Sequence, residues 1–466
     1  MRRRSELALA LVTLGLASGC KKRDERPEEV PVPPRNAATL DVVNTELGTG
    51  LALRLGLAPT SVRWERVVVL DDERAVLLGR DNDVAYALRT NDRGRTWSSV
   101  SATVKSWASW GLASSGALAL VSGAPERPKT AGPAVPKATP VTEVTWWYAA
   151  PGDKSLDGPR ALLPGEGPLA GVTLPNAAGS PAFVEEGVSL LGGRSGKNAV
   201  LVNAKSLGSA AAPPNELDMQ AFVPFPFGRP PKLLSVGKAG VELRSWPAPG
   251  EPLGVASAIP GLRPDATTLA QLSEGPSCEA GAFSYRRLAG AQPWVVGVSG
   301  ERALAFKLPA SEVARLSCAA DAVVTETTVV DPSDPERKRR VPQLVRCGQD
   351  GRCSEPKAPP FAVWSEKHER EIWSVPTARG LVAVMRARTG TRWGLYLGQS
   401  NDGGTTFELP RTIGEGAESR SELAFGALLR FQSRLVLLLS ADVGSTGRRG
   451  WYALASEDDG NNWGPP

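Results

Sequence analysis

The chain has 466 residues, of which 41% are apolar and 22% charged, so it can bury a substantial core and is not a disordered protein. Its 49 Gly and 40 Pro disfavour long helices and favour short strands joined by turns. The formal net charge of +5 gives no argument for nucleic acid, and a single histidine excludes a multi-histidine metal site within one chain. That residue, His368, lies in a charged run and is interpreted as a solvated surface residue. We therefore predict an all-β protein with no metal or other cofactor.

The first 20 residues have the order of a secretory signal. Residues 2–4 are all arginine, and residues 7–16 are an apolar stretch too short to span a bilayer. Small residues at 17–19 then lead into Cys20, an ending that resembles a bacterial lipobox, although Ala17 stands where Leu is usual. The resemblance implies that residues 1–19 are removed and that Cys20 carries a lipid. An ordinary secretory signal is the alternative.

Residues 20–38 are charged and then rich in proline, without apolar periodicity, so a flexible tether is expected there. Removal of residues 1–19 takes away three Arg and one Glu and leaves a nearly neutral chain. We expect the protein at the bacterial cell envelope, held at the membrane by its N-terminal lipid. Lys21 rather than Asp follows the cysteine, which by the enteric sorting pattern favours the outer membrane.

Three segments repeat one pattern after a strand-like run that contains a tyrosine. Each has Ser or Thr, an Asp two residues later, a Gly two further on and an aromatic residue three beyond that. Asp can accept hydrogen bonds from the amides of a turn, and Gly permits a positive φ where the chain reverses. The aromatic residue then begins the next strand. The pattern comprises Thr90, Asp92, Gly94, Thr96 and Trp97; Ser400, Asp402, Gly404, Thr406 and Phe407; and Ser456, Asp458, Gly460 and Trp463, with Asn462 in place of the second hydroxyl residue.

These segments resemble the Asp-box, or BNR-repeat, β-propellers, a family that includes sialidases, sortilin-type receptors and photosystem assembly factors. The resemblance implies that each box lies at the turn between the third and fourth strands of a blade. β-rich hairpins precede the boxes at 74–88, 381–397 and 434–454, and similar hairpins without a box begin near residues 116, 188, 232, 278 and 322. Their spacing is typical of propeller repeats of roughly 40 to 50 residues. Residues 39–466 are thus predicted to form a single β-propeller of seven to eight four-stranded blades.

The last box ends at Trp463, which leaves no room for the final strand of its blade. A segment within residues 39–57 is therefore predicted to pair with the blade that contains Ser456 and to close the ring. Residues 123–143 carry several prolines and lysines and are predicted to protrude as an extended loop.

If Cys20 is lipidated, four cysteines remain in an oxidising compartment. Cys347 and Cys353 flank the turn residues Asp350-Gly351, so a disulfide is expected across this turn, in the place of a box. Cys278 and Cys318 are then predicted to pair by elimination. A free thiolate with a base, which Cys-dependent catalysis needs, is not evident.

The sharpest enzymatic alternative is an exo-acting glycoside hydrolase of sialidase type. The resemblance implies three Arg around a carboxylate, a Tyr nucleophile with a Glu, and an Asp acid/base. The family's early Arg-Ile-Pro motif is absent, and Arg229-Pro230 is its nearest counterpart. Four of the five tyrosines are interpreted as copies of one strand position: Tyr86, Tyr396, Tyr452 and Tyr148. Tyr285, followed by two arginines, is left as a weak catalytic candidate.

Two further segments are interpreted as structural. The aromatic run 222–227 is expected to pack beneath the propeller, with stacking on a sugar or peptide as the alternative. The basic run 337–340 is expected to be a solvated hairpin tip, with binding of an anionic lipid or glycan as the alternative. We predict a monomeric, non-catalytic scaffold that binds an unknown envelope protein or glycan and no nucleic acid.

Overall fold

The computed structural model describes the chain over a series of residue ranges. They are residues 53–55, 57–104, 107–113, 115–125, 141–162, 182–184, 188–195, 198–203, 209–211, 232–237, 240–245, 257–259, 262, 277–280, 283–288, 294–299, 302–308, 312–319, 321–330, 335–336, 340–355, 370–378, 380–389, 392–402, 406–408, 410–417, 423–443 and 448–464. Within these ranges every regular element is a strand, as the composition predicts. The same ranges contain no helix with the length and apolarity needed to cross a membrane.

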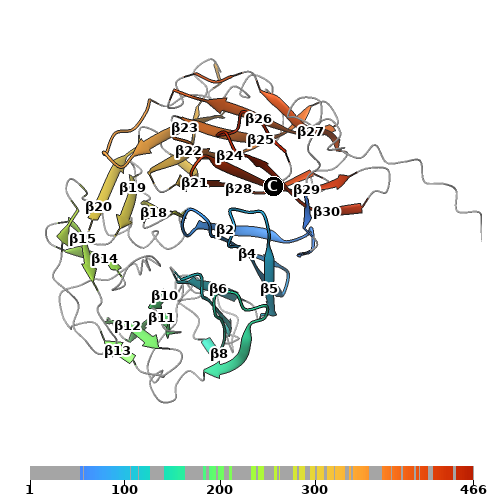
Figure 1. Ribbon diagram of the computed structural model, residues 1–466. Helices are drawn as coiled ribbons and strands as arrows, with labels where there is room; N and C mark the ends of the chain where they lie inside the picture. Colours follow the sequence, from blue (N-terminus) through green and yellow to red (C-terminus); the bar gives the residue numbers. More distant parts are fainter. Residues whose placement is uncertain are drawn as a thin grey trace, which may run out of the picture.

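The strands form eight consecutive antiparallel meanders, which we number units 1 to 8 (Figure 1). Unit 1 comprises β2 (Arg63–Val69), β3 (Ala75–Asp81), β4 (Val84–Thr90) and β5 (Ser98–Thr103), and unit 2 comprises β6 (Trp107–Leu112), β7 (Leu118–Pro125), β8 (Val141–Ala149) and β9 (Asp157–Leu162). Unit 3 comprises β10 (Ala182–Val184), β11 (Val188–Ser195), β12 (Asn198–Asn203) and β13 (Ser209–Ala211), and unit 4 comprises β14 (Lys232–Gly237), β15 (Gly240–Ser245) and β16 (Ser257–Ala258).

Unit 5 comprises β17 (Ser277–Ala280), β18 (Phe283–Leu288), β19 (Trp294–Ser299) and β20 (Arg302–Lys307), and unit 6 comprises β21 (Glu312–Ala319), β22 (Ala322–Val330) and β23 (Arg340–Gly348). Unit 7 comprises β24 (Arg370–Pro376), β25 (Leu381–Thr389), β26 (Arg392–Ser400) and β27 (Arg411–Ala417), and unit 8 comprises β28 (Leu423–Phe431), β29 (Arg434–Val443), β30 (Arg448–Ser456) and β1 (Leu53–Leu55). Each of the eight predicted hairpins falls in its own unit. Units 4 and 6 have three strands within the described residues rather than four.

The middle strands are apolar on both faces because neighbouring units pack against each other face to face. In β3, Val76, Leu77 and Leu78 are all fully buried, and they alternate between two clusters. Val76 and Leu78 belong to the cluster shared with unit 2, whereas Leu77 belongs to the cluster shared with unit 8. Further clusters lie between units 7 and 8, 6 and 7, and 5 and 6. Among the described residues the core is thus a set of layers between adjacent units, from unit 5 through units 6, 7, 8 and 1 to unit 2.

The predicted N-terminal strand is confirmed. β1 pairs antiparallel with β30, with Leu53 opposite Ala453 and Leu55 opposite Trp451. Gly464 exchanges two hydrogen bonds with Ala455 of β30. Since β29 occupies the other edge of β30, Gly464 lies on the same edge as β1. The outer strand of unit 8 is therefore assembled from both ends of the folded chain.

The arrangement of units 1 and 5 differs from the predicted single ring. β17 pairs parallel with β2, with Glu279 opposite Val68 and Ala280 opposite Val69, so units 1 and 5 share one eight-stranded sheet. In an eight-bladed ring these units would lie on opposite sides of the channel. An ion pair between Arg66 and Glu279 accompanies this short pairing. Blade-like meanders are therefore established, whereas closure into one propeller is not.

Several sequence predictions concern residues outside the described ranges. The signal, Cys20 and the tether belong to this part, as does most of the predicted protruding loop, whose flanks form the ends of β7 and β8. The others are Gly404, His368, Arg229-Pro230, the aromatic run 222–227 and residues 337–339 of the basic run.

Candidate functional site: the Asp-box turns and the contacts between units

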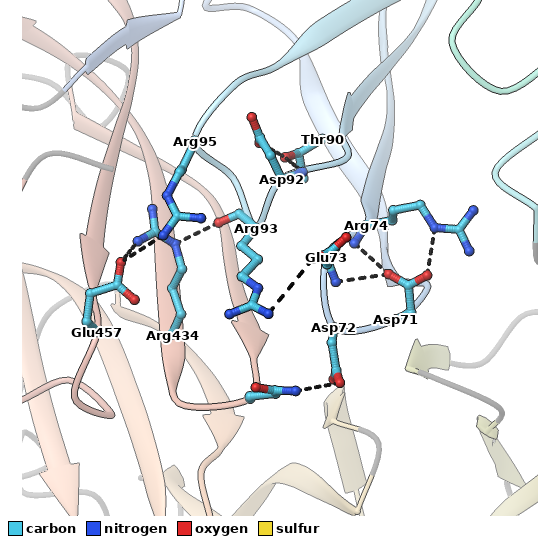
Figure 2. Close-up of polar contacts among 11 residues, drawn as sticks. Asp71, Asp72, Glu73, Arg74, Thr90, Asp92, Arg93, Arg95, Arg434 and Glu457 are labelled. Atoms are coloured by element: carbon cyan, nitrogen blue, oxygen red, sulfur yellow. Dashed lines mark hydrogen bonds and ion pairs between the residues drawn. The ribbon is translucent and has the colours of Figure 1, made fainter.

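The first of the three repeated segments, each of which we name a box, is a self-contained turn at the end of β4. The Thr90 hydroxyl donates to Asp92 Oδ1 (2.9 Å) and accepts from the Gly94 amide (2.8 Å). Asp92 Oδ1 also accepts from the Thr96 amide (2.8 Å), while Oδ2 accepts from the Thr96 hydroxyl (2.5 Å). Figure 2 shows the bond from Thr90 to Asp92. With the two bonds from Thr96, both carboxylate oxygens are occupied inside the turn.

The third box reproduces this geometry with a different residue. The Ser456 hydroxyl donates to Asp458 Oδ1 (2.8 Å) and accepts from the Gly460 amide (2.8 Å). Asn462 takes the place of Thr96, because its backbone amide binds Oδ1 (2.8 Å) and its side-chain amide binds Oδ2 (2.6 Å). A side-chain N–H thus substitutes for the hydroxyl, which accounts for the departure from the repeat pattern.

The second box keeps the acidic centre but changes the aromatic residue. Asp402 accepts from the Ser400 hydroxyl (2.9 Å) and from the amide and hydroxyl of Thr406 (2.8 and 2.6 Å). In the other two boxes the tryptophan indole N–H donates to the carbonyl of the box glycine, from Trp97 to Gly94 (3.0 Å) and from Trp463 to Gly460 (2.9 Å). Phe407 has no such donor.

We expect Trp97→Phe to lower the free energy of unfolding by about 1 kcal/mol, since the Gly94 carbonyl loses the indole N–H while the ring is largely retained. Trp64→Phe is the matched control, because its buried indole nitrogen has no partner among the described residues. Chemical denaturation of both variants measures the difference. Equal losses would show that ring volume, and not the hydrogen bond, decides the effect.

The box carboxylates are stabilised in their ionised form. Partial burial by itself raises the pKa of Asp92 and of Asp458, but hydrogen bonds from Thr96 and Thr90, and from Asn462 and Ser456, outweigh it and hold each pKa below its usual value. In Asp71 the amides of Glu73 and Arg74 and the Arg74 guanidinium lower the pKa in the same way, again against the effect of burial.

A pH dependence of stability follows from these pKa values. A carboxyl whose pKa is lower in the folded state stabilises the protein fully above its unfolded pKa, about 3.9. That contribution is lost as the pH falls through the folded pKa. We expect the melting temperature to be flat from about pH 5 to 7 and to fall below about pH 4. Asp92→Asn with Asp458→Asn should weaken the fall, and an unchanged acid limb would contradict this assignment.

Each of three turns is held by an adjacent unit. For the third box in unit 8, Arg411 of unit 7 donates to the carbonyls of Gly460 (2.7 Å) and Asn461 (2.6 Å), and Gln399 donates to that of Asp459 (3.1 Å). The box glycine packs against Val382 of unit 7, and its φ of +98° is accessible to glycine.

The same arrangement recurs at the other two junctions. For the first box in unit 1, Arg434 of unit 8 donates to the Arg93 carbonyl (2.8 Å). For the turn after β8 in unit 2, the buried Arg89 of unit 1 donates to the carbonyls of Ala150 and Asp153. No sequence pattern predicted these contacts. Arg89 and Gln399 directly precede the first residue of a box, and this was the one local signal available.

Charged side chains surround the junction of units 1 and 8 (Figure 2). The Glu457 carboxylate pairs with Arg434 and lies 3.7 Å from Arg95. Arg93 lies 3.9 Å from Glu73, and Gln432 donates to Asp72 (2.6 Å). Burial lowers the pKa of Arg434, and the neighbouring Arg95 lowers it further. The carboxylates therefore balance arginines that the fold has brought together.

Two further arginines tie several units to each other. Arg66 of unit 1 pairs with Glu279 of unit 5 and donates to the Trp110 carbonyl of unit 2 (3.2 Å). Arg430 of unit 8 pairs with Asp321 of unit 6 (2.9 Å) and donates to the Pro376 carbonyl of unit 7 (3.3 Å). These guanidinium groups are therefore structural ties.

The predicted disulfide between Cys347 and Cys353 is present and replaces a box. Gly348 pairs with Ala322 in the way that Thr90 pairs with Ala75. Asp350 follows Gly348 by two residues, as Asp92 follows Thr90, so the two aspartates occupy corresponding positions. Its carboxylate accepts from the Arg352 amide (3.1 Å). The second predicted disulfide is not formed in this structure, in which Cys278 and Cys318 are buried thiols.

The tyrosine interpretation needs two corrections. In unit 1, the repeated tyrosine Tyr86 lies four residues before Thr90, the residue that pairs with Ala75. The residue of unit 2 that corresponds to Thr90 is Ala149, which pairs with Leu118. The tyrosine position of unit 2 therefore holds Thr145, and Tyr148 is not a fourth copy. Tyr285, the weak catalytic candidate, is 0% exposed and packs against Gly297 and Phe306. A nucleophile must reach its substrate, and an enclosed hydroxyl cannot do so. This tyrosine is therefore part of the core. Among the described residues, His, Cys, Asp and Glu form no group suited to a metal ion.

No protein-family model and no curated protein matches this chain. Solved structures with a similar arrangement include an ulvan lyase of polysaccharide lyase family PL25 (11% identity, 89% of this chain and 94% of that chain, TM-score 0.37). Others are the NanB sialidase of Streptococcus pneumoniae (11%, 86% and 69%, TM-score 0.33) and the β-propeller domain of the Trilobed protease of Pyrococcus furiosus (9%, 75% and 94%, TM-score 0.31). At these TM-scores the likeness carries no argument about activity.

Proposed function

We propose that this chain is a non-catalytic β-propeller scaffold of the cell envelope, anchored by a lipid on Cys20, that binds a protein or a glycan. The proposal is supported by the hydrogen bonds of the repeated polar residues, which lie within the turns and between units. Both oxygens of Asp92 and of Asp458 are occupied by their own turns. The neighbouring arginines donate to backbone carbonyls of adjacent units. The boxes therefore serve architecture and leave binding to other surfaces.

The burial of the tyrosines weighs against the sialidase-type alternative. Tyr285 is wholly enclosed, and Tyr396 and Tyr452 are also buried. A glycosidase that uses a tyrosine nucleophile needs that hydroxyl in contact with the sugar. We therefore expect the full chain to show no turnover of a fluorogenic sialoside. Turnover that is abolished by Tyr285→Phe would overturn the scaffold proposal.

A pull-down from envelope extract tests the binding role. The lipidated protein serves as bait, and the Cys20→Ser variant separates a membrane-dependent partner from one that recognises the folded body. The result expected is a defined protein or glycan retained by both forms, with the bait itself eluting as a monomer. If neither a protein nor a glycan is retained in a larger amount than by an unrelated lipoprotein bait, the result would count against a scaffold.

The lipid anchor has its own test. Metabolic labelling with palmitate should mark the wild-type protein and leave Cys20→Ser unlabelled, and membrane fractionation should place the labelled form with the outer membrane. Equal labelling of both forms would remove Cys20 as the attachment site.

A further inference from the structure

All four cysteines of the folded body contribute to one buried cluster between units 5 and 6. Cys278 lies on β17 of unit 5, and Cys318 lies on the adjacent β21 of unit 6. Cys347 belongs to β23 and is already joined to Cys353. The cluster thus holds one disulfide and two thiols.

The strand register selects the partner of Cys318. Within unit 6, Cys318 lies opposite Val323, and Val323 lies opposite Cys347, so one strand separates the two cysteines. Two strand spacings amount to roughly 9 to 10 Å, which is beyond the separation of about 7 Å that a disulfide can bridge. Cys278, by contrast, lies on β17 of the neighbouring unit, which packs against β21, and it belongs to the same buried cluster as Cys318.

We propose that Cys278 and Cys318 are a modification site at which a second disulfide forms between units 5 and 6 when the chain folds in the presence of a disulfide oxidant. Each thiol gives up its proton and the two sulfurs form one S–S bond. The two electrons and two protons pass to the oxidant, a small-molecule or protein disulfide, which becomes two thiols. The structure holds the reduced form of this pair.

Burial confines the reaction to folding. Desolvation raises the pKa of the Cys318 thiol well above its usual value, and the hydrogen bond and charge of Cys278 and the charge of Glu279 raise it further. Since the thiolate is the attacking species, a folded chain exchanges slowly. During folding both thiols are accessible, and the bond forms before the cluster closes.

The bond would join two sets of units, each of which is held by one arginine that contacts three units. Arg66 ties unit 1 to units 2 and 5, whereas Arg430 ties unit 8 to units 6 and 7. Cys278 is the neighbour in sequence of Glu279, the carboxylate that binds Arg66. A covalent link from unit 5 to unit 6 connects the two groups directly.

Peptide mapping of the full chain with Cys20→Ser tests the proposal, since this variant retains only the four cysteines of the cluster. The protein is refolded either with glutathione disulfide or with dithiothreitol, alkylated and digested without reduction. The oxidised sample should yield a peptide pair joined through Cys278 and Cys318, in addition to the Cys347–Cys353 loop. Separate alkylation of Cys278 and Cys318 in that sample, or a Cys318–Cys347 pair, would overturn the proposal.

Two further measurements keep the proposal testable where a variant folds poorly. Glutathione disulfide added to the folded, reduced protein should join the pair at least about tenfold more slowly than during refolding, and equal rates would refute control by burial. The oxidised form should melt several degrees above the reduced form. That difference should shrink in Cys278→Ala with Cys318→Ala, where only the Cys347–Cys353 bond still separates the two forms, and a large part of it should persist in Cys347→Ala with Cys353→Ala. An undiminished difference in the first pair would contradict the proposed link.

Discussion

Arg66→Met is expected to lower the free energy of unfolding by about 3 kcal/mol, because it leaves the carboxylate of Glu279 buried without its cation. The Glu279 side chain is 1% exposed, and its second oxygen has no partner among the described residues, so little water can replace the guanidinium. The variant also removes the donor to the Trp110 carbonyl of unit 2. Urea unfolding of the purified chain measures the loss.

A paired substitution separates charge from packing at this site. Arg66→Met combined with Glu279→Gln should recover a large part of the loss, because no unpaired charge is then buried. Arg352→Met is the matched surface control, since Arg352 lies 3.9 Å from Asp350 and its side chain is 91% exposed. It should change stability by less than about 0.5 kcal/mol. A loss in Arg66→Met no larger than in this control would show that Arg66 does not tie units 1 and 5 together.

Asp92→Ala is expected to cost about 1 to 3 kcal/mol, because the Thr90 hydroxyl and the amide and hydroxyl of Thr96 lose their acceptor together. Differential scanning calorimetry should show a lower melting temperature with binding of any captured partner unchanged. Asp83→Ala serves as control, because that carboxylate is 80% exposed and lies 3.8 Å from Arg80. It should change stability by less than about 0.5 kcal/mol.

The outcome of Asp92→Ala also decides between architecture and binding. A variant of wild-type stability that had lost a specific ligand would assign the first box to recognition. A variant that is destabilised but binds normally once folded would confirm the turn as structural.

The Asp-boxes were readable from the sequence because their hydrogen bonds join residues two and four positions apart, as from Thr90 to Asp92 and from Asp92 to Thr96. Turn chemistry of this kind depends on a few neighbouring residues and little else. The N-terminal strand was predicted from the four-stranded repeat, because a blade keeps an exposed edge unless a fourth strand covers it. β1 takes that place beside β30.

The contacts between units were not readable in this way. Arg411 reaches a turn 49 residues further along the chain, and Arg434 reaches back 341 residues to the first box. Arginine is common on strands, and nothing beside these residues in the sequence marks the carbonyls that they meet. The interpretation of Tyr148 failed because its neighbours suggested a strand position that only the pairing of Leu118 with Ala149 defines.

By itself, the sequence determined the all-β class, the eight hairpins, the three repeated Ser/Thr–Asp turns, the disulfide between Cys347 and Cys353 and the return of the N-terminal strand. Only the tertiary structure placed β17 beside β2, buried Tyr285 and brought Arg434 to the first box. The first group depends on turn chemistry, strand patterning and short sequence separations. The second depends on which apolar faces meet when whole units pack, and such faces are too alike in composition for the sequence to specify their partners.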